Sequence, residues 1–151
     1  MEKNQNYINE INVTYARKAF FNTVIHNSES ASEIAREIFA MECAQLELKE
    51  HFYIILLNRA NTVIGFHKLS EGGISGTVVD IRIAFAVALK SLASGVILVH
   101  NHPSGKTHPS DADLEITKKF KEAGNLLDIL ILDHIILSTV GYSSFADEGW
   151  I

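Results

Sequence analysis

The stretch that decides the fold of this chain runs from Gly95 to Asp113 and reads GVILVHNHPSGKTHPSDAD. Its first part, Gly95–Val99, is small and apolar throughout, which is typical of a short strand buried on both faces. From Asp111 onward apolar residues recur with helical spacing. The stretch therefore leaves a buried strand, crosses a polar loop and enters a helix.

The end of this strand carries two histidines, His100 and His102. In extended chain the side chains at i and i+2 point to the same face, so both imidazoles can be directed at one point. Asp113, in the first turn of the following helix, is able to return to that point as an anionic ligand. Two histidines and one carboxylate leave an open coordination position for water, which is the arrangement of a catalytic zinc site.

The loop between strand and helix contains both prolines of the chain, Pro103 and Pro109, and their fixed φ angles would stiffen the ligand geometry. A purely structural interpretation also exists. Ser110 and Asp113 match a capping box, and a lone histidine at a strand end is usually a hydrogen-bonded surface group. Spacing, stiffening and position taken together favour the metal site.

The rest of the sequence predicts an α/β domain in layers, with a sheet covered by helices. A capping-box pattern at Ser30 and Glu33 predicts a helix that extends to about Leu48. Strands are expected over 52–57 and 62–67, joined as a hairpin by a turn over 58–61, and also over 9–15, 77–79 and 95–99, with one or two more strands over 126–137. Two further helices are expected, one over 82–92 that is buried on nearly every side and one over 111–123 that Gly124 stops. The loop over 72–76 is expected to be mobile.

Composition limits the class of protein. The chain has 151 residues, of which 47% are hydrophobic, and we expect one compact domain over 1–151. A net charge of −5 makes direct nucleic-acid binding a poor first hypothesis. The single cysteine, Cys43, excludes an internal disulfide and a cysteine-based zinc site. No signal peptide or membrane span is recognisable, so we expect a cytoplasmic protein.

The pattern His-x-His-Pro-x-Gly, continued to Pro-Ser-x-x-Asp, resembles the JAMM motif of JAB/MPN-domain metallopeptidases. The stretch HNHPSG with Asn101, together with Asp133-His134-Ile135 and Ser144-Phe145, resembles the bacterial RadC subfamily. The resemblance covers about residues 9–151 and lacks the helix-hairpin-helix segment that often precedes this domain in RadC proteins.

The resemblance implies a three-layer α-β-α domain with a mixed sheet, of the cytidine-deaminase-like type, although deamination itself is disfavoured because the chain lacks the cysteines of that site. It implies zinc-dependent hydrolysis of peptide or isopeptide bonds in a peptide or protein substrate, by zinc-activated water. His100, His102 and Asp113 match the zinc ligands, and Ser110 matches a serine that supports the water or the oxyanion.

The family also uses a glutamate on an upstream strand, and Glu50 is the best match, with Glu47 as the alternative. The chemistry requires such a group, because a carboxylate must take the proton of the water and pass it to the leaving amine.

Two of the remaining residues have two interpretations each, and a third has one. His134 is either a hydrogen-bonded core histidine or a group that orients the site. Arg82 is either a partner in a surface salt bridge, which we favour, or an anchor for a substrate carboxylate. His108 is expected to be exposed. Three alternative functions stay open, namely a non-haem iron enzyme, a DNA-repair-associated module and a catalytically idle JAB scaffold.

Overall fold

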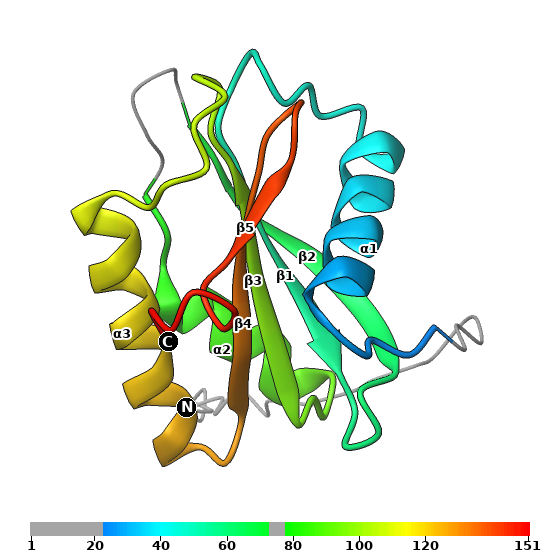
Figure 1. Cartoon of the computed structure of the whole chain (residues 1–151). Helices are drawn as coiled ribbons and strands as arrows, with labels where there is room; N and C mark the ends of the chain where they lie inside the picture. The colour runs from blue at the N-terminus through cyan, green and yellow to red at the C-terminus, as the bar shows by residue number, and fades with distance from the viewer. Residues whose placement is uncertain (1–22, 73–77) are drawn as a thin grey trace, which may run out of the picture.

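The computed structural model describes residues 23–72 and 78–151. Five strands form one sheet in the order β2-β1-β3-β4-β5, with α1 on one face and α2 and α3 on the other (Figure 1). This confirms the predicted three-layer α-β-α arrangement. The elements in chain order are α1 (Ser28–Met41), β1 (His51–Leu57), β2 (Val63–Glu71), α2 (Ile81–Lys90), β3 (Gly95–Asn101), α3 (Asp111–Leu126), β4 (Leu130–Leu137) and β5 (Tyr142–Ser144).

The sheet is mixed, as predicted. β1 pairs antiparallel with both β2 and β3, whereas β3 pairs parallel with β4, which is reached through α3. The predicted hairpin between β1 and β2 is confirmed. Its turn is held by the Asn58 Oδ1, which accepts hydrogen bonds from the backbone N–H groups of Ala60 and Thr62. Asn61 takes the left-handed conformation, φ 56°, which asparagine tolerates well.

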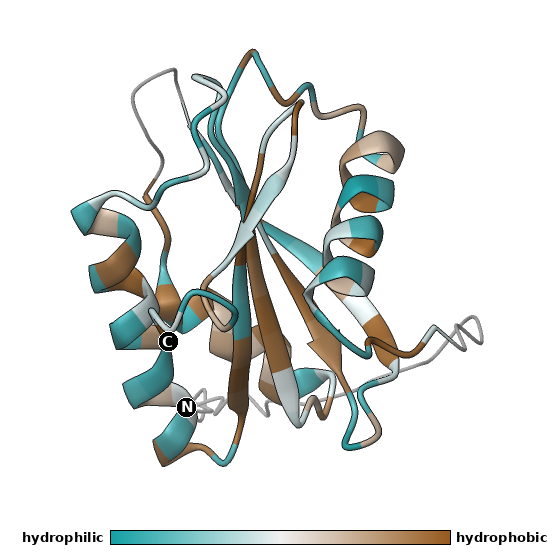
Figure 2. Cartoon of the chain, in the orientation of Figure 1, coloured by the Kyte–Doolittle hydropathy of each residue, from teal (hydrophilic) through white to brown (hydrophobic). Residues whose placement is uncertain are grey.

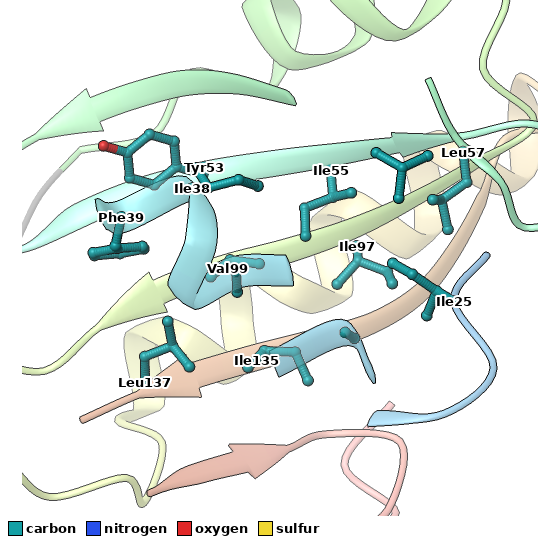
Figure 3. Packing of buried hydrophobic residues seen from close by; sticks show 13 residues of the cluster. Ile25, Ile38, Phe39, Tyr53, Ile55, Leu57, Ile97, Val99, Ile135 and Leu137 are labelled. Atoms are coloured by element: carbon teal, nitrogen blue, oxygen red, sulfur yellow. The ribbon is translucent and has the colours of Figure 1, made fainter. Parts of the chain in front are cut away.

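Each face of the central strands packs into its own core. On β1, Tyr53, Ile55 and Leu57 face α1 (Figure 3), while Phe52, Ile54 and Leu56 face α2 and α3. This alternation follows from the twofold period of a strand. Because both faces are covered, β1 and β3 are buried along their whole length, and they are the hydrophobic centre of the molecule in Figure 2.

The predicted limits of α1 are wrong at both ends. The N-cap is Asn27, whose side chain accepts from the Ser30 N–H, and the Ser30 hydroxyl accepts from the Asn27 N–H in return. Ser30 is therefore the third residue of the helix, which closes the capping box, rather than the N-cap, and Glu33 has no part in it. The helix ends at Met41, and Cys43 takes a left-handed conformation that breaks helical continuation well before Leu48.

Other expectations need smaller corrections. α2 buries one face only, because Ile83 and Leu89 are about half exposed. Val78 and Val79 lie outside any strand. The expected strand over 9–15 and the mobile loop, for all but Gly72, lie outside the described residues. Among the described helices none has the length and apolarity to cross a bilayer.

Gly124 does not stop α3, which continues to Leu126. A Cβ on Gly124 would meet the backbone carbonyl oxygen of Ile129 closer than real Cβ atoms approach, so the glycine lets the chain turn back into β4. We predict that Gly124→Ala destabilises the protein by about 1–3 kcal/mol, because backbone cannot move aside as a side chain can. Urea denaturation measures the loss. Gly65→Ala, where a Cβ meets nothing within 4 Å, is the control and should change stability by at most about 0.5 kcal/mol; equal effects would contradict the steric explanation.

Candidate metal centre

The structure brings the three predicted ligands together at the carboxyl end of β3. His100 is fully buried near the end of the strand, His102 follows it, and Asp113 lies in the first turn of α3. The Nε2 atoms of the two histidines are 2.9 Å apart. The carboxylate oxygens of Asp113 lie 3.2 Å from Nε2 of His100 and 3.3 Å from Nε2 of His102. Three ligand atoms so close together form a cluster that could bind a metal ion.

A chain of buried hydrogen bonds determines which nitrogen of His100 carries the proton. The Thr117 hydroxyl donates to the Asp113 carbonyl oxygen at 2.6 Å. The Thr117 oxygen is then free to accept from Nδ1–H of His134, also at 2.6 Å. His134 Nε2 therefore accepts from Nδ1–H of His100 at 2.7 Å. The chain leaves Nε2 of His100 unprotonated, with its lone pair directed at the cluster.

His102 is oriented in the same sense by the loop. Its Nδ1 lies 2.8 Å from the Lys106 carbonyl oxygen, which can only accept, so Nδ1 carries the proton and Nε2 presents a lone pair. Two imidazole lone pairs and one carboxylate thus converge on one point, and none of these three groups brings a hydrogen atom to it. Such a point calls for a positive charge, either a proton or a metal cation.

The electrostatics of the cluster agree with this description. A hydrogen bond with Asp113 raises the pKa of His102 above its ordinary value, against the opposing effect of burial. Burial alone would raise the pKa of Asp113, but hydrogen bonds from His102 and Ser110 hold it well below its usual range. Asp113 is therefore an anion, and it favours the protonated form of His102.

Ser110 is the N-cap of α3, which confirms the capping-box interpretation. Its hydroxyl donates to Oδ2 of Asp113 at 2.7 Å and accepts from the Asp113 N–H at 3.2 Å. The Ser110 N–H also donates to the same carboxylate oxygen. The cap therefore does two things, since it begins the helix and it fixes the orientation of a cluster carboxylate.

Glu50 lies immediately before β1 and lines an open cleft of about 560 Å³ together with His102, Ser110 and Asp113. Burial raises the pKa of the Glu50 carboxyl, while the nearby His100 and His102 lower it in part. A carboxylate with a raised pKa beside a cluster that could bind a metal is suited to accept and return a proton. Glu47 is exposed in a turn and does not line this cleft.

Sequence reasoning missed two residues that support the cluster. Phe52 stacks on the His100 ring with centroids 5.5 Å apart and planes 6° apart, and it forms the apolar wall beneath the site. Thr117 completes the hydrogen-bond chain to His134. The signal for Thr117 was its position four residues after Asp113, one turn further on the same helix face.

The residues left with two interpretations are now placed. His134 is fully buried and hydrogen-bonds to His100, so it is at once a core histidine and an orienting group. Burial lowers its pKa, which keeps it neutral. Arg82 pairs with Asp80 at 2.7 Å and is 90% exposed, as the salt-bridge interpretation predicted. His108 is exposed and meets the edge of Trp150.

Comparison with known proteins agrees with the sequence resemblance. Residues 25–150 match the family model of the RadC-like JAB domain. Similar curated proteins, each called UPF0758 protein, include one from Flavobacterium johnsoniae, 53% identical over 66% of this chain and 44% of the relative, and one from Syntrophomonas wolfei, 40% identical over 85% of this chain and 54% of the relative. A third, from Porphyromonas gingivalis, is 42% identical over 67% of this chain and 45% of its own length.

The chain spans about half the length of these relatives, and their shared name states no substrate or activity. The family model, in contrast, covers most of the chain and includes every residue of the cluster and of the cleft. The chain belongs to the RadC-like JAB domain family.

Proposed function

We propose that this chain is a zinc-dependent hydrolase of the metallopeptidase or isopeptidase type, with zinc held by His100, His102 and Asp113. The observation that carries the proposal is the convergence of three lone pairs on one point beside an open cleft. Two imidazoles and one carboxylate suit zinc and leave a coordination position open. Zinc bound there would supply a Lewis acid that lowers the pKa of water and polarises a carbonyl group.

The residues of the chain have separate roles in this proposal. Glu50 accepts a proton from water on its carboxylate and returns it to the leaving amine. The Ser110 hydroxyl, at the edge of the cleft, turns its one proton from Oδ2 of Asp113 to the oxygen on which negative charge develops. Phe52 and the fully buried His134 exclude bulk water from beneath the cluster. Peptide or protein is the substrate class that fits this chemistry.

Three observations bear on the alternatives. The carboxylate with a raised pKa in the cleft supports hydrolysis over a catalytically idle scaffold, which needs no proton acceptor. The net charge of −5 argues against direct binding of nucleic acid. A two-histidine, one-carboxylate set also suits iron, and that alternative is decided by metal analysis.

We predict one zinc per chain in the purified protein and no stoichiometric zinc in the His100→Ala/His102→Ala variant. The fold should persist, because neither core depends on the metal.

Zinc affinity should fall as the pH is lowered, because protons compete for His102. The fall begins above pH 6.5 because the pKa of His102 is raised above that ordinary value. Elemental analysis measures the zinc content, and chelator competition between pH 8 and 6 measures the zinc affinity. His108→Ala, an exposed histidine of the same loop, should keep its zinc; iron in place of zinc would contradict the proposal.

Glu50→Gln should retain zinc and lose about two to four orders of magnitude in rate, because the amide keeps the shape of the side chain but accepts no proton. The assay uses substrates found by screening a peptide library and ubiquitin-like isopeptide linkages. Glu47→Gln changes the same residue type at an exposed position nearby and should keep the full rate. A Glu50→Gln protein with unchanged turnover would remove Glu50 from the mechanism.

Ser110→Ala separates capping from catalysis. The variant should lose about 1 kcal/mol of stability, as is typical of a lost N-cap, and about a hundredfold in rate. Asn27→Ala removes the N-cap of the other capping box, at α1. It should show a similar stability loss in denaturant melts with no loss of rate. If Ser110→Ala keeps its rate, Ser110 is a cap and nothing more.

A further inference from the structure

Asn101 stands between His100 and His102 in the sequence but does not belong to the metal cluster. On β3, Ile97 and Val99 pack in the core beneath α1, whereas His100 lies on the other face, stacked on Phe52. The alternation of the strand turns Asn101 toward the α1 face, where it is fully buried. A buried amide at this place needs hydrogen-bond partners, and their identity shows what it does.

All the partners of the Asn101 side chain lie on the segment that leads into β1. Its Nδ2 donates to the carbonyl oxygens of Leu46 at 2.7 Å and Lys49 at 2.8 Å. Its Oδ1 accepts from the backbone N–H of His51 at 2.8 Å. This segment and the loop after β3 lie at the same end of the sheet (Figure 1).

These bonds enclose one residue. The carbonyl of Lys49 belongs to the peptide unit before the Glu50 Cα, and the N–H of His51 belongs to the unit after it. Because each unit is planar, one rigid amide that holds both fixes φ and ψ of Glu50. The carbonyl of Glu50 itself accepts from the Gly72 N–H at 2.8 Å, which holds the same residue from the β2 side.

We propose that Asn101 is a positioning residue that sets the Glu50 carboxylate against the metal cluster; this rests on the proposed function. Glu50 needs such a restraint because it lies outside the paired strands, at the end of an irregular segment of turns over 42–50. A proton acceptor contributes fully only when its geometry is fixed before the reaction. Asn101 acts through Glu50, since its own side chain lies on the face away from the cluster.

The test compares Asn101→Leu with wild type, both loaded with Co²⁺ and carrying ¹³C-labelled glutamate carboxyl carbons. The Glu50 signal is identified by its absence in Glu50→Gln. In wild type it should be a single, strongly shifted paramagnetic signal. In Asn101→Leu the shift should shrink and the signal broaden, while cobalt stoichiometry is kept. The matched control is Asn58→Leu, which removes an asparagine that holds the turn at the opposite end of β1, and it should leave the Glu50 signal unchanged.

Kinetics give the second measurement. Asn101→Leu should lower kcat by about ten- to a hundredfold with little change in KM, and in a Glu50→Gln background it should cause no further loss. A structural defect unrelated to Glu50 would instead lower kcat by the same factor in the Glu50→Gln background as in the wild type. An unchanged cobalt shift in Asn101→Leu, or full multiplication of the two losses, would overturn the proposal.

If Asn101→Leu does not fold, hydrogen exchange in wild type decides. The His51 amide should be protected as strongly as that of Leu98 in β3, and exchange as fast as the exposed Glu47 amide would overturn the proposal. The two proposals fail in different ways. Absence of hydrolysis by the wild type in every screen contradicts the proposed function, while the cobalt signal tests the positioning of Glu50 by itself.

Discussion

The antiparallel pairing of β1 with β3 is the contact that assembles the cleft. In its register Phe52 faces His100, and the same register continued by two residues sets Glu50 at the level of His102. Alternation along both strands keeps Phe52 and His100 on the face of α3, and Glu50 and His102 lie on the same side just beyond the strand ends. A shift of one residue would turn Glu50 toward α1 and away from the cluster, so the buried side chains that fix the register also fix the chemistry.

The cluster is held in place by groups outside the cluster itself. Thr117 and His134 fix one imidazole and the Lys106 carbonyl fixes the other, while Ser110 fixes the carboxylate. The lone pairs are therefore arranged before any metal binds. The hydrogen bond between His102 and Asp113 raises the pKa of His102, and it lowers the pKa of Asp113 against the effect of burial.

The residues that follow β4 bury His134, the histidine that orients His100. Asp133 accepts hydrogen bonds from Ser144 Oγ and from the Ala146 N–H, which bends the chain after β5 back over the sheet. Phe145 then stacks on His134 with ring centroids 4.5 Å apart, and Trp150 packs against both Phe145 and His108. The residues Asp133-His134 and Ser144-Phe145, which resembled the RadC subfamily, are thus one structural unit that buries the orienting histidine.

The sequence alone determined what is local. Strand period, helix period and the His-x-His spacing predicted the layers, the buried β3 and the three residues that the structure brings together as a cluster, because those features depend on residues a few positions apart. Contacts between distant segments were decided only by the tertiary structure. They include the hydrogen-bond chain from Thr117 to His100 and the Asn101 amide that encloses Glu50. The sequence showed Asn101 only as part of the HNHPSG motif, because its hydrogen-bond partners lie about fifty residues earlier and meet it only when β1 pairs with β3.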